Sequence, residues 1–194
     1  MLRITSGEFR NRRIEVPKGG KIRPMLEKPR QALFSILGQD VTEDRPVLDC
    51  FAGTGVLGFE ALSRGASHAT FVDIEASHVK AINDLAAHLG CSDRCTVLRS
   101  DTLKFLTPDS VLRTPDSSKM RLLFVDPPHA LVKERGREFF EWFAALADAS
   151  FAGDDTLVVY GHHESDESAE QVGRWRRFDR RDYGNVAISL YQRA

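Results

Sequence analysis

Short apolar runs alternate with segments of helical periodicity along most of the chain. Strands are predicted where a short apolar run leads into a glycine, an acid or a turn, over residues 47–51, 69–73, 96–98, 121–126 and 156–160. Helices are predicted between and around them, over residues 27–37, 56–64, 76–89, 101–106 and 133–149. Strands that alternate with helices predict a parallel sheet covered by helices on both faces.

The two ends of the chain follow a different pattern. Residues 2–16 alternate loosely, with turn-like residues inside, and predict a short hairpin that a glycine-rich loop separates from the first helix. Residues 175–192 predict a closing hairpin that turns at 183–185, and residues 107–119, rich in Pro, Ser and Asp, predict a surface loop. We therefore expect an α/β, Rossmann-like fold with a mostly parallel seven-stranded sheet and a C-terminal antiparallel hairpin.

Composition narrows the class of protein. The chain has 194 residues, of which 42% are hydrophobic and 28% charged, which suits one domain with a small appendage. We assign residues 1–40 to a basic hairpin-and-helix extension and residues 41–194 to the main domain. No apolar run approaches the length of a membrane span, the N-terminus has no signal-like apolar core, and three cysteines form no framework. The expected setting is the reducing cytoplasm, without a membrane partner.

The net charge of −1 hides a marked segregation of positive and negative charge along the chain. Residues 1–30 carry a net charge of +6 and residues 171–194 a net charge of +4, whereas residues 31–170 carry −11. Basic ends around an acidic middle favour a polyanionic partner that meets one face of the protein. The alternative for either end alone is a solvated arginine-rich face without a partner.

A glycine-rich turn follows the first strand of the main domain. It runs from Asp49, and Gly53, Gly55 and Gly58 within it have the spacing G-x-G-x-x-G. Glycines let the backbone approach a ligand at the positive end of a helix, and Asp73, at the end of the next strand, is placed to accept hydrogen bonds from a ribose. The turn therefore predicts a site for a nucleoside-containing cofactor.

Two features favour S-adenosylmethionine over NAD as that cofactor. Asp49 puts negative charge where a dinucleotide would place its pyrophosphate, whereas a cationic sulfonium and ammonium would be stabilised there. The second feature is the sequence Asp126-Pro127-Pro128-His129, directly after the strand over residues 121–126. Ligands bind beyond the carboxyl ends of parallel strands, so Asp126 is expected in the same crevice as the glycine turn.

The Asp-Pro-Pro motif suits recognition of an amino group. Two successive prolines donate no N–H and have a restricted φ, so the nearby carbonyls are rigidly held acceptors. A carboxylate and a carbonyl match the two donors of an NH₂ group and would aim its lone pair at a sulfonium methyl. An ordinary turn is the alternative for this motif alone, but its position favours methylation of an exocyclic amine on a base.

With these motifs in place, the sequence resembles the RsmD-type bacterial 16S rRNA guanine-N2 methyltransferases over nearly the whole chain. The resemblance implies a class I, S-adenosylmethionine-dependent methyltransferase fold. It implies methylation of one guanine in 16S rRNA, in the 30S subunit or its assembly intermediate. It is carried by Ser6–Arg13, Arg23-Pro24, Arg30–Ser35, Leu48–Ala66, Phe124–Pro128 and Leu190–Arg193.

The resemblance also implies roles for individual residues. The guanine amine would lie against the catalytic group Asp126, Pro127, Pro128 and His129, the last of which stands where an aromatic residue is usual. The cofactor-binding residues would be Asp49, Phe51, Gly53, Thr54, Gly55, Asp73, Ile74, Asp101 and Thr102. The residues that meet rRNA phosphates would be Arg10, Arg13, Arg23 and Arg30.

The other polar residues suggest less. Cys91 and Cys95 have no second pair, so no metal site is expected. His162 and His163 are expected to be exposed loop residues, and Trp175 is expected to pack in the core rather than stack on RNA. A monomer is adequate for the predicted site.

Three alternative functions stay open on the sequence. An N6-adenine methyltransferase acting on DNA or RNA would use similar Asp-Pro-Pro chemistry, although few residues are left for a DNA target-recognition domain. An RNA-binding assembly factor could keep the fold without catalysis, although Asp73 and Asp126 are intact. An NAD-linked dehydrogenase would explain neither the Asp-Pro-Pro motif nor the basic N-terminus.

Overall fold

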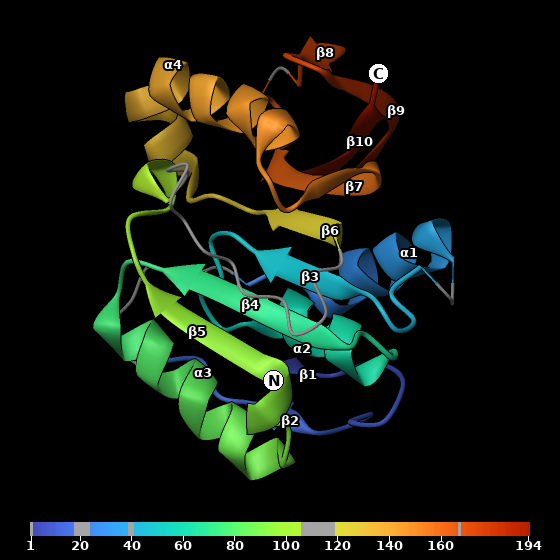
Figure 1. Ribbon diagram of the computed structural model, residues 1–194, viewed down its shortest axis with the longest axis vertical. Coiled ribbons are helices and arrows are strands. Elements are labelled where there is room, and N and C mark those ends of the chain that lie inside the picture. Colours follow the sequence, from blue (N-terminus) through green and yellow to red (C-terminus); the bar gives the residue numbers. More distant parts are fainter. Residues whose placement is uncertain (1, 18–23, 39–40, 106–118, 167) are drawn as a thin grey trace.

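A computed structural model describes residues 2–17, 24–38, 41–105, 119–166 and 168–194. Its centre is an eight-stranded sheet in the order β5-β4-β3-β6-β7-β10-β9-β8 (Figure 1). The parallel strands are β3 (Pro46–Asp49), β4 (His68–Asp73), β5 (Cys95–Arg99), β6 (Met120–Val125) and β7 (Ala152–His163). The antiparallel part consists of β8 (Gln171–Val172), β9 (Trp175–Tyr183) and β10 (Val186–Arg193).

Helices cover both faces of this sheet. One face carries α1 (Glu27–Leu37), α2 (Val56–Ser63) and α3 (Ala76–Leu89), and the other carries α4 (His129–Ala145). Phe34 of α1 packs on Phe124 of β6 with ring centroids 6.1 Å apart, so α1 packs directly on the central sheet. Because both faces are covered, β3 and β4 are buried along their whole length, which explains the successive apolar residues Val47-Leu48 and Phe71-Val72.

The structure confirms the Rossmann-like fold and differs from the sequence prediction at several boundaries. β7 begins at Ala152 and runs to His163, beyond both predicted ends. The two-residue strand β8 was not predicted and makes the sheet eight-stranded instead of seven-stranded. The helix predicted from residue 133 begins at His129, directly after the prolines, and the turn after β5 is a short 3₁₀ helix, η2 (Thr102–Lys104). Most of the predicted loop over 107–119 lies outside the described residues.

The N-terminal hairpin shares the core of the main domain. Its strands β1 (Leu2–Arg3) and β2 (Arg13–Ile14) flank a loop whose Ile4 and Phe9 join the apolar cluster beneath α2. A Cβ on Gly7, which has φ +80°, would lie 1.6 Å from the Ser63 carbonyl oxygen at the end of α2. Glycine is therefore required for this close approach, which explains the Ser-Gly-Glu-Phe segment in physical terms.

Arg30 corrects one sequence expectation. It was expected to meet rRNA phosphates, but it is fully buried, and its Nε donates to Glu60 Oε2 at 3.1 Å. Its guanidinium also donates to the carbonyl oxygens of Met25 and Arg3. Glu60 in turn accepts from the amide and hydroxyl of Thr5. Arg30 therefore joins α1, α2 and the hairpin inside the protein and presents no charge to a ligand, because it is buried and each of its three guanidinium nitrogens donates a hydrogen bond internally.

Candidate functional site

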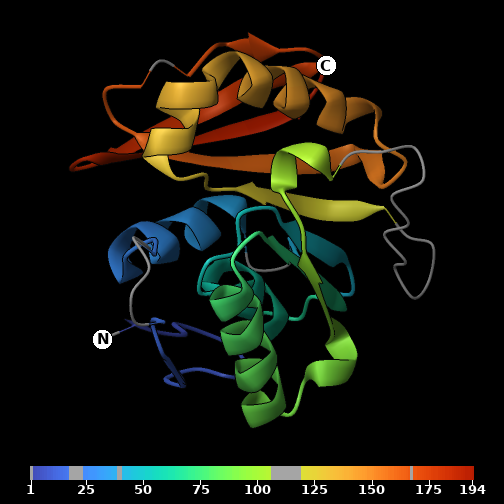
Figure 2. The ribbon, with the colours of Figure 1, turned by 90° about the vertical axis from the view of Figure 1, so that its left-hand side faces the viewer.

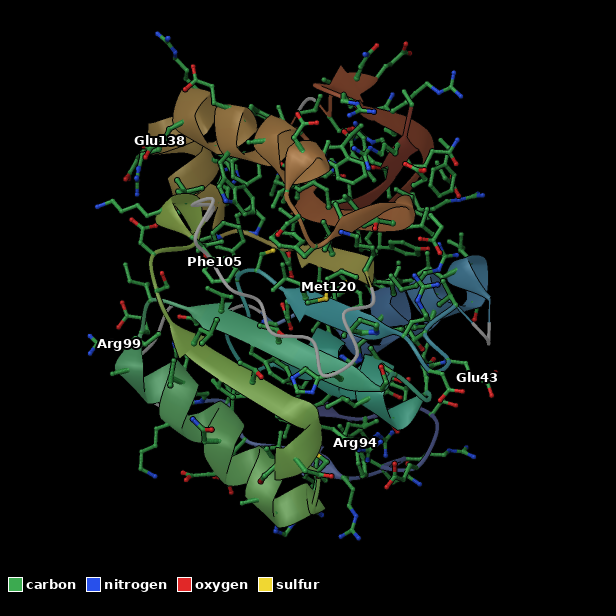
Figure 3. The ribbon with its side chains drawn as sticks, in the orientation of Figure 1. Glu43, Arg94, Arg99, Phe105, Met120 and Glu138 are labelled. Carbon is green, nitrogen blue, oxygen red and sulfur yellow. The ribbon has the colours of Figure 1, made fainter. Side chains whose placement is uncertain are left out.

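Four carboxylates gather at one edge of the sheet. Asp49 and Asp73 end β3 and β4, Asp126 follows β6, and Asp101 lies two residues beyond β5. The arrowheads of β3, β4 and β6 point to the same side in Figure 1, and Figure 2 views the molecule from that side. In Figure 3, Arg99 at the end of β5 lies on this side, and Met120 at the start of β6 lies toward the other. Parallel strand order therefore collects acids that are far apart in sequence.

Two of these carboxylates hold the glycine turn between β3 and α2. The amide of Gly53 donates to Asp73 Oδ2 at 2.7 Å, and the amide of Gly58 donates to Asp49 Oδ2 at 3.1 Å. Gly53 and Gly55 have φ values of +53° and +72°, which favour glycine. A Cβ on Gly58 would lie 2.3 Å from the Phe71 ring of β4, so this glycine lets α2 pack close to the sheet.

The residues around the turn fit a cofactor with a ribose and a cationic group. Thr54 stands between the two turn glycines, and its hydroxyl is buried without a hydrogen-bond partner among the described residues. This hydroxyl is therefore free to bond to a ligand at the turn. Asp73 also accepts from the Glu75 amide at 2.9 Å and contacts His78 Nδ1 at 3.0 Å, both through Oδ1. Oδ2 of Asp73 thus has accepting capacity left for a ribose hydroxyl.

Burial strongly perturbs two of the carboxylates. Burial raises the pKa of Asp49 to about 7, the Gly58 hydrogen bond opposes this shift, and the charges of Asp126 and Asp73 add to it. Burial also raises the pKa of Asp126 to about 6. A cation placed between these groups would offset their mutual repulsion and favour the ionised forms. The electrostatics therefore match a positively charged ligand better than a pyrophosphate.

Asp126 stands apart from the other acids because its carboxylate is unengaged. Neither oxygen accepts a hydrogen bond from any residue that the structure describes, although the side chain is largely enclosed. It lies over Gly161 of β7, where a Cβ would come within 2.3 Å of Asp126 Oδ1. The sequence reasoning missed Gly161, although a single glycine inside a strand often marks such a close approach. The two free oxygens can accept from a ligand amine.

The two prolines lead directly into α4. Pro127 is buried, whereas Pro128 is exposed and precedes the first turn as its N-cap residue. His129 is the first residue of α4, its side chain is 53% exposed, and its Nδ1 lies 3.2 Å from Asp166 Oδ2. Its ring also lies 5.2 Å from that of His163. The expected catalytic group is therefore contiguous at the site edge, with an imidazole at its rim.

His162 is not the exposed loop residue that the sequence predicted. It lies near the end of β7 and is buried, because β7 extends further than the apolar run suggested. Its Nε2 lies 3.0 Å from the hydroxyl of Ser189, and its ring stacks on Tyr160 at 4.7 Å. His162 is therefore a structural residue of the sheet. Trp175 is packed, as expected, and its Nε1 donates to the Phe143 carbonyl.

The other residues expected to bind the cofactor differ in exposure and in their hydrogen bonds within the protein. The ring of Phe51 packs on Trp142 at 5.6 Å, and Ile74 is 55% exposed beyond β4. Asp101 caps η2 by accepting from the Leu103 amide at 3.1 Å. The hydroxyl of Thr102 is buried and donates to the Cys50 carbonyl at 2.5 Å, so it holds the turn in place and has no free donor.

The arginines at the two ends of the chain differ in availability. Arg10, Arg12 and Arg13 of the hairpin are exposed and form no ion pair within the described ranges, whereas Arg23 lies outside the described residues. Four C-terminal arginines, by contrast, pair with nearby aspartates. These are Arg174 with Asp148, Arg180 with Asp182, Arg181 with Asp179 and Arg193 with Asp154. Arg176 and Arg177 of β9 form no ion pair within the described ranges either. Unpaired arginines therefore lie at both ends of the chain, three of them on the N-terminal hairpin.

A metal site and a membrane-spanning helix each place requirements on the described parts of the chain. Among these residues, no group of three or more His, Cys, Asp or Glu side chains could hold a metal ion. The three cysteines are free thiols. In the same residues, no helix combines the length and apolar character that crossing a bilayer requires.

Several known proteins are similar to this chain over nearly its whole length. The family model described as "Conserved hypothetical protein 95" matches residues 2–192. The Ribosomal RNA small subunit methyltransferase D of Escherichia coli (strain K12) is 34% identical over 194 residues, which cover 99% of this chain and 90% of that protein. The protein of the same name from Haemophilus influenzae is 27% identical, with 98% of this chain and 93% of that protein covered.

Solved structures agree with this relationship. The Escherichia coli protein yhhF, described as a candidate methyltransferase, superposes with a TM-score of 0.80 at 30% identity, covering 99% of this chain and 97% of that one. An RNA methyltransferase of Salinibacter ruber in complex with S-adenosyl-L-homocysteine has a TM-score of 0.58 at 15% identity, covering 88% and 93%. The second likeness supports the fold alone.

The raised pKa of Asp49 generates a prediction about stability. Because the folded pKa of about 7 exceeds the ordinary value of 3.8, the native state loses stability as pH rises between these values. Asp49→Asn keeps an acceptor for the Gly58 amide and removes the buried charge. We expect the variant to exceed the wild type in free energy of unfolding at pH 8, by up to about 4 kcal/mol, with the difference shrinking toward pH 4.

Urea unfolding at several pH values measures this difference. Asp84→Asn, on the exposed surface of α3, is a matched control and should change little with pH. A wild-type to Asp49→Asn difference that stays constant from pH 5 to pH 8 would show that Asp49 titrates normally in the folded protein.

Proposed function

The chain belongs to the family described as Conserved hypothetical protein 95, that of the RsmD-type methyltransferases, and from that membership we propose its reaction. It transfers a methyl group from S-adenosylmethionine to the exocyclic N2 amine of one guanine in bacterial 16S rRNA. The substrate is the 30S subunit or its assembly intermediate, and a cytoplasmic monomer carries out the reaction. Membership supports the methylation of ribosomal RNA, and the site chemistry supports an amine as the acceptor.

The unengaged carboxylate of Asp126 is the observation that carries the proposal. It follows β6, has no hydrogen bond within the described residues, and lies beside two prolines that donate no N–H. An amine with two donors satisfies Asp126 and a neighbouring carbonyl at once. Orientation by these two acceptors directs the nitrogen lone pair out of the plane of the base, toward the reacting methyl group.

Other residues of the chain bind and align the reactants. S-adenosylmethionine, when bound, supplies the methyl group on a sulfonium. Asp73 accepts from its ribose, the turn from Gly53 to Gly55 approaches it closely, and Asp49 stabilises positive charge near the sulfur and ammonium. Phe51, Ile74, Asp101 and Thr102 line the adenosine side. Ionised Asp126 also stabilises the positive charge that develops on the amine, and its raised pKa of about 6 suits a proton acceptor.

Residues 1–40 form the RNA-contacting extension in this proposal. Arg10 and Arg13 are exposed on the hairpin, and Arg23 lies in the segment that follows. Phosphate contacts by such side chains give affinity and orientation without reading sequence. Arg30, which is buried, contributes by joining the extension to α2. A flipped guanine is required, because its amine must leave the stack to reach the sheet edge.

Removal of Asp126 tests the catalytic part of the proposal. Asp126→Ala deletes one of the two acceptors for the amine, and we expect turnover to fall by about 10²–10³-fold. Cofactor affinity, measured by calorimetry, should change little. The assay follows labelled methyl transfer to unmodified 30S particles, naked 16S rRNA and DNA, with digestion to nucleosides. N2-methylguanine in the RNA product is the expected result.

The controls separate catalysis from folding and from the alternative function. Asp154→Ala, at a fully exposed position, should retain wild-type turnover. N6-methyladenine in the product, from RNA or DNA, would replace this proposal with the adenine alternative. Full turnover of Asp126→Ala would remove Asp126 from the chemistry.

Salt dependence tests the hairpin as an RNA-binding surface. Arg10→Ala combined with Arg13→Ala removes two phosphate contacts, so rRNA should bind more weakly. The slope of log K against log salt should flatten by roughly 1.4 to 1.8. Filter binding at several salt concentrations gives this slope. Lys80→Ala on α3 is a matched control for loss of an exposed cation, and an unchanged slope in the double variant would contradict a phosphate-binding role for the hairpin.

A further inference from the structure

An exposed aromatic ring lies among arginines on β9, in the C-terminal segment whose net charge is +4. Phe178 is 47% exposed, and its ring packs on no aromatic ring or guanidinium among the residues that the structure describes. A single exposed phenylalanine is common on protein surfaces and needs no function. Phe178 differs because the backbone, the neighbouring charges and the shape of the surface around it all favour a ligand.

The backbone presents Phe178 through a β-bulge. Leu190 and Tyr191 of β10 pair with Asp179 and Arg177, so Phe178 is the extra residue of β9 and has no partner in the register. Bulges change the direction of a side chain and occur often beside functional sites. β8 pairs only with Trp175 and Arg176, so no strand of the described chain covers the edge of β9 at Phe178. Exposed apolar residues are usually avoided on such an edge.

The ring borders a surface hollow of about 570 Å³. The residues that line this hollow are Glu170, Gln171, Arg176, Arg177, Phe178, Asp179 and Arg180. Arg177 donates to the Ser168 hydroxyl at 2.5 Å, and Arg180 pairs with Asp182 at 3.2 Å. Arg176, by contrast, is exposed and forms neither an ion pair nor a side-chain hydrogen bond within the described ranges. Arg176 therefore supplies a cation that is free for a ligand.

The mixture of groups in the hollow matches a nucleotide better than a bare anion. An aromatic face stacks on any unpaired base, and a neighbouring arginine neutralises the phosphate. The carboxylates of Glu170 and Asp179 would repel an isolated phosphate, whereas they can accept hydrogen bonds from the N–H groups of a base. Paired bases of a duplex are stacked on one another and leave no face for Phe178. The chemistry therefore favours an unpaired nucleotide.

We propose that this surface, which we call the Phe178 hollow, binds an unpaired nucleotide of the rRNA substrate. The ring of Phe178 stacks on the base, and Arg176 pairs with an adjacent phosphate. This inference rests on the proposed function, because it takes RNA as the substrate. It adds a second RNA-binding surface, formed by the opposite end of the chain from the N-terminal hairpin.

Strand register places the Phe178 hollow away from the reacting groups. Tyr183, at the end of β9, pairs with Val186, which in turn pairs with His163 at the end of β7. Phe178 precedes Tyr183 by five residues, or roughly 17 Å along the strand. β7 and β10 separate β9 from β6, which adds roughly 14 Å across the sheet (Figure 1). The base on Phe178 is therefore not the base that is methylated, and the contact acts on RNA binding.

Two substitutions of Phe178 test the stacking contact. Phe178→Leu keeps an apolar side chain and removes the aromatic face, whereas Phe178→Tyr keeps that face. With unmodified 30S particles as substrate, we expect Phe178→Leu to raise KM about tenfold and to leave kcat unchanged, because the contact is remote from the reacting atoms. Phe178→Tyr should keep the wild-type KM. Melting temperatures of both variants should equal that of the wild type.

Arg176→Ala tests the phosphate contact by filter binding to 16S rRNA. Loss of one contact to a single strand should flatten the slope of log K against log salt by about 0.7. Lys80→Ala on α3 again controls for loss of an exposed cation and should leave the slope unchanged.

The outcomes separate this inference from the proposed function. A wild-type KM in Phe178→Leu, with N2-methylguanine still formed, would overturn the stacking contact and leave the proposed function intact. Wild-type protein that self-associates through this surface, and loses that association in Phe178→Leu without a change in KM, would assign the hollow to a second copy of the chain. Wild-type protein that methylates no RNA would overturn both.

Discussion

The site depends on hydrogen bonds between two carboxylates at strand ends and the backbone of the glycine turn. Asp73 accepts from Gly53, and Asp49 accepts from Gly58, so β3, β4 and α2 are joined at one point. Asp49 also lies near Asp126 and Asp73, and burial together with repulsion from these two carboxylates raises the pKa of Asp49. The protein thus keeps an electrostatically unfavourable edge that a cationic ligand stabilises. Such local conflict between stability and charge is typical of functional sites.

The N-terminal extension depends on a second buried group, the carboxylate of Glu60 in α2. Arg30, Arg64 and Thr5 all bond to it, which joins α1 and the hairpin to the helix that begins at the glycine turn. Gly7 lies so close to Ser63 that no side chain fits there. The exposed arginines of the hairpin are therefore held in a defined position relative to α2. The proposed RNA-binding hairpin and the proposed catalytic residues at the sheet edge are thus connected through one short helix, α2.

Sequence predicted the parts of the structure that follow local rules. The ranges 27–37 and 76–89 are helices with the predicted ends, because periodicity and a C-terminal glycine define them. The glycine turn, Asp73 and Asp126 meet at one edge because parallel strands require it. Long-range contacts were not predictable. The burial of Arg30 depends on Glu60, thirty residues away. The burial of His162 depends on Ser189 in a strand that pairs with β7. The close approach of Asp126 to Gly161 depends on the register between β6 and β7, which the sequence does not define.

In the proposed mechanism, one edge of the sheet holds the cofactor and the acceptor amine side by side. A crystal structure of the protein soaked with S-adenosyl-L-homocysteine would show where the cofactor lies. We expect the ribose on Asp73 and the thioether sulfur facing Asp126. A ligand bound away from the turn between Gly53 and Gly55, or with its sulfur turned away from Asp126, would overturn this arrangement.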